Sequence, residues 1–156
     1  MSIDISDLVS PDLIAVNVPA TTKNALLSFT ATLFAARLPV DADAVTAALI
    51  EREKLGSTGF GGGIAVPHAR IEGLGRITAA VVRLAQPITF DAVDDARVDV
   101  VIAMLSPLTA GADHLKALAR VARRLRNTDF VAKLRGAGSR DAVWALLATD
   151  ETRDAA

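Results

Sequence analysis

The chain has 156 residues, of which 51% are hydrophobic and 22% are charged. The apolar residues are enough for one buried core, and the chain is too short for two ordinary domains. The formal net charge of −1 argues against a nucleic-acid-binding protein, and the apolar runs are far too short to span a membrane. There is no cysteine, so disulfides and thiolate chemistry are excluded. We expect one domain over residues 1–156, with a core at about 8–150, in a cytoplasmic protein without membrane insertion.

The first part of the chain predicts a strand followed by two helices. The apolar run Leu13–Val18 is typical of a short strand. A 3.6-residue apolar period then predicts a helix that begins at Thr21 or Thr22 and that Pro39 ends. Asp41 can begin a second helix, and Gly56 stands where the residue after a helix C-terminus is expected.

The middle of the chain predicts two buried strands. The segments Ile77–Leu84 and Val98–Leu105 are nearly continuous apolar runs with β-branched residues, which is typical of strands covered on both faces. Between them, Pro87–Asp91 indicates a turn with a short strand. Because this connection is too short for a helical crossover, the sheet is expected to be mixed.

The last part predicts three helices. The first begins around Asp113 and carries an expected buried stripe of Leu115, Leu118, Ala122 and Leu125. Its expected solvated face holds the basic residues Lys116, Arg120, Arg123, Arg124 and Arg126. Short helices follow at 129–135 and 139–148, with Trp144 and Leu147 facing inward, and residues 151–156 resemble a frayed tail. Strands covered on both faces and alternating with helices predict an α/β fold, a three-layer sandwich with a mixed central sheet and helices on both faces.

A glycine-rich segment ends at one of the two histidines of the chain. Five of the ten glycines fall within residues 56–63, and the segment closes on Pro67 and His68. Backbone this permissive, with hydroxyls nearby and an imidazole at its end, suits an anion held beside a nucleophile. We interpret the anion as a phosphoryl group and His68 as the nucleophile. The alternative is a surface loop whose glycines only relieve turn strain.

Three familiar glycine-rich motifs do not fit these letters. A Walker A loop ends in Gly-Lys-Ser/Thr, but no lysine lies between Lys54 and Lys116. A dinucleotide fingerprint that starts at Gly59 would need a third glycine at the position of Ile64. A serine nucleophile elbow needs one residue between glycine and serine, whereas Ser57 directly follows glycine.

Four further residues are candidates for holding the phosphoryl group. Arg52 falls in the last helical turn before the glycines, where its guanidinium could reach an anion. Ser57 and Thr58 offer hydroxyl donors. His114 begins the third helix, whose positive end favours a neutral ring and a nearby anion. Each residue also has an ordinary explanation, as a solvated charge, a loop residue or a helix N-terminus.

Metal binding is the chemical alternative at these residues. Two histidines and an aspartate can hold catalytic zinc, but the chain has no H-E-x-x-H and no H-x-H spacing. We therefore expect no metal and no other cofactor.

The run from Glu51 to Gly59 and the segment Gly63–His68 strongly resemble the EIIA domains of the fructose/mannitol class in the bacterial phosphoenolpyruvate phosphotransferase system. Within that class the chain is most similar to the nitrogen-regulatory EIIA proteins. The resemblance continues through Gln86–Asp91 and 98–105 and reaches His114, which opens a helix.

The resemblance implies a sheet between helices and a transient phosphohistidine at His68. The implied activity is that of a phosphotransferase, in which His68 accepts the phosphoryl group from an HPr-like phosphocarrier. His114 matches the supporting histidine of the family, and Arg52, Ser57 and Thr58 match positions that line the phosphoryl pocket. The next partner is implied to be either a regulatory target protein or, if the chain is a sugar-specific EIIA, an EIIB protein. No nucleic-acid partner is expected.

Overall fold

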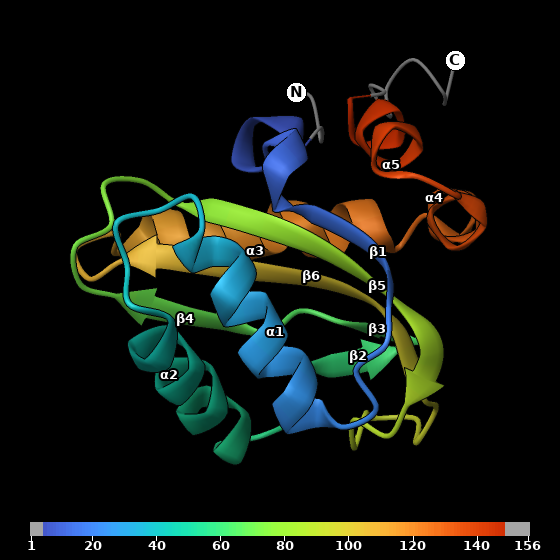
Figure 1. Ribbon diagram of the computed structural model, residues 1–156, viewed down its shortest axis with the longest axis horizontal. Coiled ribbons are helices and arrows are strands. Elements are labelled where there is room, and N and C mark those ends of the chain that lie inside the picture. Colours follow the sequence, from blue (N-terminus) through green and yellow to red (C-terminus); the bar gives the residue numbers. More distant parts are fainter. Residues whose placement is uncertain (1–4, 149–156) are drawn as a thin grey trace.

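The computed structural model describes residues 5–148 as a mixed sheet with helices on both faces (Figure 1). The strands are β1 (Ile14–Val18), β2 (Gly59–Gly61), β3 (Ile64–Ala65), β4 (His68–Ile71), β5 (Thr78–Ile88) and β6 (Val98–Pro107). The helices are α1 (Lys23–Ala35), α2 (Ala42–Lys54), α3 (Ala112–Leu125), α4 (Thr128–Gly136) and α5 (Arg140–Leu147), preceded by the 3₁₀ helices η1 (Ser6–Leu8) and η2 (Pro11–Leu13). Residues 151–156, the expected tail, lie outside the described part of the chain.

The sheet is mixed, as the short connection between its two long strands predicts. Its order is β1-β5-β6-β3-β2. β4 also pairs with β6, further along that strand than β3. β5 and β6 are antiparallel, whereas β1 runs parallel to β5, and both β3 and β4 run parallel to β6. β6 is buried almost throughout, and β5 is buried over most of Thr78–Leu84, so apolar side chains occupy both faces of these segments, whereas residues 85–87 of β5 are exposed.

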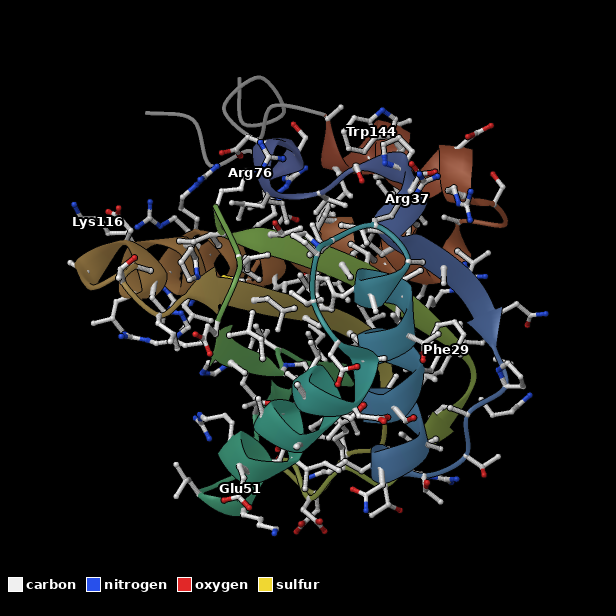
Figure 2. All side chains as sticks on the ribbon, turned by 60° about the vertical axis from the view of Figure 1, so that its left-hand side comes forward. Phe29, Arg37, Glu51, Arg76, Lys116 and Trp144 are labelled. Atoms are coloured by element: carbon white, nitrogen blue, oxygen red, sulfur yellow. The ribbon has the colours of Figure 1, made fainter. Side chains whose placement is uncertain are left out.

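Helices cover the two faces of this sheet, which confirms the three-layer fold. Figure 1 shows α1 and α2 in front of the sheet and α3 behind it. The predicted caps hold two of the helices: Thr22 accepts a hydrogen bond from the amide of Ala25, and Asp41 accepts one from the amide of Ala44. Charged residues on the outer sides of the helices extend away from the protein, as Figure 2 shows for Glu51 and Lys116.

Two predicted boundaries are displaced. α1 ends at Ala35, before Pro39, and the intervening residues fold back as turns on the carbonyl of Phe34. β5 continues to Ile88, so it takes in the first two residues of Pro87–Asp91, where a turn with a short strand was predicted. An irregularity in the pairing with β6 between Arg83 and Ile88 lets β5 extend past Pro87, which has no amide to donate.

The buried face of α3 differs from the predicted stripe. Leu115 is 66% exposed, whereas Arg124, expected on the solvated face, is 1% exposed. The residues that face the core are His114, Ala117, Val121, Arg124 and Leu125. The first four are spaced by three and four residues, as regularly as the predicted stripe, but they include a histidine and an arginine, which a pattern of apolar residues does not reveal. Arg124 lies over the ring of Phe130 at 3.9 Å and donates to the carbonyl of Leu146, and so it joins α3 to α4 and α5.

The last two helices agree with prediction. Asn127 caps α4 and Ser139 caps α5, each through its side-chain oxygen. Leu147 is fully buried, and Trp144 is half-buried against the same core.

Candidate functional site

An open cavity of about 440 Å³ lies between the end of α2, the strand β4 and the start of α3. Its lining residues are Ala48, Glu51, Arg52, Leu55, His68, Ala69, Arg70 and His114. Three of the predicted site residues, Arg52, His68 and His114, therefore meet at one place, although they are far apart along the chain. Since Ala48, Arg52 and Leu55 are spaced by four and three residues, they share one face of α2.

His68 is held by a strand. It begins β4 and lies opposite Met104 of β6, whose amide donates to the carbonyl of Pro67 at 2.9 Å. Its ring nitrogen Nδ1 lies 2.8 Å from the carbonyl oxygen of Val66. A carbonyl can only accept, so Nδ1 carries the proton in this contact. The neutral ring then has its lone pair on Nε2, and that nitrogen is the available nucleophile.

The surroundings of His68 favour its neutral form. Burial lowers the pKa of the imidazole below its ordinary value of 6.5, and the nearby Arg52 guanidinium lowers it further. The Val66 hydrogen bond and the Glu53 carboxylate raise the pKa. Burial is the largest effect, so the net result is a lowered pKa. At neutral pH the ring is therefore uncharged and able to attack an electrophile.

His114 faces His68 across the cavity. The two ring centroids are 5.5 Å apart, and the ring planes are inclined by 52°. Only 6% of His114 is exposed, and its Nδ1 lies 2.6 Å from the hydroxyl oxygen of Ser106. Burial lowers the pKa of His114, and the positive charges of a protonated His68 and of Arg70 add to that effect. Both imidazoles are thus neutral near pH 7.

Two arginines border the cavity. Arg52 donates from Nη1 to the carbonyl of Gly56 at 2.9 Å, which folds its side chain over the end of its own helix. Arg70 was not predicted as a site residue, although its sequence position carried a signal. Alternate residues of a strand point to the same side, so Arg70 shares the face of β4 that carries His68. An anion in the cavity would lie close to both guanidinium groups.

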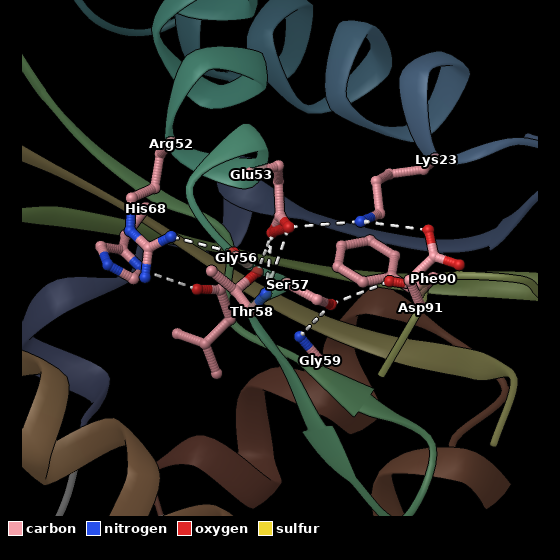
Figure 3. A network of polar contacts seen from close by, with 11 residues as sticks. Lys23, Arg52, Glu53, Gly56, Ser57, Thr58, Gly59, His68, Phe90 and Asp91 are labelled. Atoms are coloured by element: carbon pink, nitrogen blue, oxygen red, sulfur yellow. Dashed lines mark hydrogen bonds and ion pairs between the residues drawn. The ribbon is translucent and has the colours of Figure 1, made fainter. Parts of the chain in front are cut away.

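Ser57 and Thr58 do not line this cavity. The Ser57 hydroxyl donates to the carbonyl of Phe90 at 2.8 Å and accepts from the amide of Gly59 (Figure 3). The hydroxyl of Thr58 bonds to the carboxylate of Glu53, which also accepts from the Thr58 amide. Both hydroxyls therefore stabilise the turn after α2, and their role in binding a phosphoryl group stays a prediction.

The permissive glycine backbone was expected to hold an anion beside His68, but residues 59–65 form a hairpin. Its strands are β2 and β3, and Gly62 and Gly63 lie at positive φ in its turn. The carbonyl of Gly62 accepts from Arg135 and its amide donates to Asp94. The turn is thus bound to residues that are distant in sequence, and none of residues 59–63 lines the cavity beside His68.

Within residues 5–148, no three histidine, cysteine, aspartate or glutamate side chains gather as a metal-binding group. In the same part of the chain, no helix is long and apolar enough to cross a membrane.

A sequence profile for the EIIA 2 component of the phosphoenolpyruvate-dependent sugar phosphotransferase system matches residues 7–149. The chain belongs to this family. Membership implies phosphoryl transfer through a phosphohistidine, and it confirms the resemblance seen in the sequence.

The individual relatives of this EIIA chain point mainly to nitrogen regulation. It is 41% identical to a nitrogen regulatory protein of Bradyrhizobium diazoefficiens over 92% of this chain and 94% of that one. It is 37% identical to a fructose-specific EIIA component of Haloferax volcanii, over 93% and 95%. Among solved structures, the nitrogen regulatory protein IIA-Ntr of Neisseria meningitidis superposes with a TM-score of 0.86 at 30% identity, covering 92% of this chain and 98% of that one.

A more distant structure shows an EIIA fold together with its partner. The complex of IIA mannitol with phosphorylated IIB mannitol from Escherichia coli matches with a TM-score of 0.75 at 22% identity, covering 89% of this chain and 96% of that one. At this identity the likeness shows the fold alone.

Proposed function

We propose that this protein is a nitrogen-regulatory phosphocarrier that accepts a phosphoryl group on Nε2 of His68 from an HPr-like donor. One observation carries the proposal: the Val66 carbonyl ties up Nδ1 of His68 and leaves Nε2 as the free nucleophile in a cavity flanked by two arginines. Its similarity to nitrogen regulatory proteins supports the regulatory role over sugar transport.

The proposed reaction needs neither a nucleotide nor a metal ion, because the phosphoryl group arrives on an activated N–P bond. The Nε2 lone pair of His68 attacks the phosphorus and forms a new N–P bond. The bond to the donor imidazole breaks, and its electron pair returns to that ring, which carries a proton on its other nitrogen and so leaves as a neutral imidazole. The Nδ1 proton of His68 stays on its hydrogen bond to Val66, so the phosphorylated ring is an imidazolium. During the transfer, Arg52, Arg70 and His114 stabilise the charge on the three phosphoryl oxygens.

The test is mass spectrometry of the full chain after incubation with phosphoenolpyruvate, enzyme I and an HPr-like carrier. We expect one acid-labile phosphoryl group per chain, and none on the His68→Gln variant, whose amide has similar size but no nucleophilic nitrogen. A His68→Gln protein that is labelled at the wild-type rate would overturn the assignment. Phosphorylation that requires ATP in place of the donor would also overturn it.

A second candidate function is that of a sugar-specific EIIA, which the fructose-specific relative favours. Such a protein passes its phosphoryl group to a cysteine of an EIIB protein. The phosphorylated chain is mixed with purified fructose- and mannitol-type EIIB proteins, and the label is followed by time. Rapid and complete transfer would favour sugar transport, whereas label that stays on His68 favours a regulator whose phosphorylation state changes partner binding.

A further inference from the structure

A buried serine contacts the second histidine of the cavity. Ser106 lies on β6, is fully buried, and places its hydroxyl oxygen 2.6 Å from Nδ1 of His114. Within the described part of the chain, this hydroxyl makes no other hydrogen bond. No sequence pattern joins Ser106 to His114, and only the fold brings the two side chains together.

The donors and acceptors at this contact determine which nitrogen of His114 carries the proton. A serine hydroxyl has one proton to donate, and a buried donor is almost always paired. For Ser106 the acceptor within reach is Nδ1 of His114. If Nδ1 carried the proton instead, it would donate to the serine oxygen and leave the hydroxyl proton without an acceptor. The neutral ring therefore carries its proton on Nε2.

We propose that Ser106 is a positioning residue that fixes the Nε2–H tautomer of His114 and so makes this ring a neutral hydrogen-bond donor to an anion in the cavity. The two facing rings are then complementary. His68 presents a lone pair on Nε2, because Val66 holds its Nδ1 proton, and His114 presents an N–H. The role as donor to a phosphoryl group rests on the proposed function, whereas the tautomer does not.

The arrangement has a chemical advantage. A histidine that must be protonated to donate from both nitrogens loses this ability above its pKa. With the tautomer fixed by Ser106, the Nε2 proton of His114 is available while the ring is uncharged. Within residues 5–148, the fully buried side-chain nitrogens and oxygens without a hydrogen-bond partner do not include Nε2 of His68 or Nε2 of His114. Both nitrogens are therefore accessible from the cavity.

The first test reads the tautomer directly. Long-range ¹H–¹⁵N spectra of the ¹⁵N-labelled full chain near neutral pH distinguish protonated from bare ring nitrogens. We expect a bare Nδ1 and a protonated Nε2 at His114 in the wild type and in Ser106→Thr, and a mixture of tautomers in Ser106→Ala. Thr30→Val is the matched control, because it removes a fully buried hydroxyl that bonds to the Leu26 carbonyl on α1. A wild-type His114 with a protonated Nδ1 would overturn the proposal, whether or not Ser106→Ala folds.

The second test measures phosphoryl acceptance by His68 in a single turnover. We expect Ser106→Ala to be slower by about fivefold, the effect of a hydrogen bond of ordinary strength, and Ser106→Thr to be close to wild type. An unchanged rate in Ser106→Ala, with the expected shift in tautomer, would overturn the donor role of His114. If the wild type accepts no phosphoryl group at all, the proposed function fails, and the spectra still decide the role of Ser106.

Discussion

The carboxylate of Glu53 accepts hydrogen bonds from both the amide and the hydroxyl of Thr58, five residues further along the chain. Glu53 is 8% exposed, and Lys23 on α1 completes its environment with an ion pair of 3.3 Å (Figure 3). The contact ties the last turn of α2 to the start of the glycine hairpin. Because Arg52 precedes Glu53 in this turn, the same contact also fixes the wall of the cavity that carries Arg52.

Replacing Thr58 by valine is expected to lower the free energy of unfolding by about 1–3 kcal/mol, because a buried carboxylate loses a donor while the side-chain volume is kept. Urea unfolding measures this loss. Thr46→Val is the control, since its half-buried hydroxyl bonds only to a carbonyl within the same helix. If Thr58 instead binds the phosphoryl group directly, the transfer rate would fall by about 10²-fold with little loss of stability.

Replacing His114 by alanine is expected to slow phosphoryl transfer by about 10²-fold, because a donor to the developing charge is lost. The protein should still fold, since the ring lies at the edge of a cavity. Single-turnover labelling with the HPr-like donor gives the rate, and circular dichroism checks the fold. A His114→Ala protein that transfers at the wild-type rate would show that the second histidine takes no part.

Replacing Arg52 by alanine is expected to have a similar effect of about 10²-fold, and Arg52→Lys should recover only part of the rate, because an ammonium group cannot present two parallel N–H donors. Arg37→Ala is a matched control, since that arginine pairs with Asp12 away from the cavity. Equal rates for Arg52→Ala and Arg37→Ala would remove Arg52 from the mechanism.

The lowered pKa of His68 has consequences for both activity and stability. Phosphoryl acceptance should persist below pH 6.5, because the neutral nucleophile survives there. Stability should be greatest above about pH 6.5 and should fall as the pH decreases towards the folded-state pKa, since the unfolded chain takes up the proton first. Titration of the ring by NMR measures the folded pKa, and His68→Gln should flatten the dependence of stability on pH. A folded pKa at or above 6.5 would contradict both expectations.

Replacing Arg124 by alanine is expected to cost about 2–4 kcal/mol of stability, because its long side chain fills the space among α3, α4 and α5. Arg123→Ala is the matched control, one residue earlier on the exposed side of the same helix. Chemical unfolding of both variants gives the comparison. Equal stabilities would mean that Arg124 contributes no more than a solvated arginine.

Much of the fold could be predicted because its elements carry local signals. The apolar runs that became β5 and β6 are strong, and caps such as Thr22 and Asp41 mark helix starts without reference to the rest of the chain. The buried face of α3 could not be predicted in this way. Arg124 is buried only because Phe130 and Leu146, on other helices, receive its guanidinium group.

The candidate site also combines features that local sequence predicts with features that depend on residues distant in sequence. His68 and Arg52 stand next to unusual local sequence, and the family resemblance joins them to His114. The hairpin at the glycines could not be predicted, because its turn is fixed by Arg135 and Asp94, which are distant in sequence. The two-residue period of a strand would have placed Arg70 beside His68, but no strand was predicted at residues 68–71.

The charges around His68 have a consequence for how partners approach. Two arginines, Arg52 and Arg70, and one glutamate, Glu51, line the cavity, so its formal charge is +1 (two minus one) while both imidazoles are neutral. A phosphoryl group brings about −1.5 to −2, which the positive charge of the phosphorylated His68 ring offsets in part, so the net charge of the cavity falls from +1 to about zero. An acidic partner should then meet the unmodified protein faster than the phosphorylated one, and a basic partner the reverse. Because the Debye length is about 8 Å at physiological salt, rising ionic strength should erase that difference in association rate before it alters the contacts themselves.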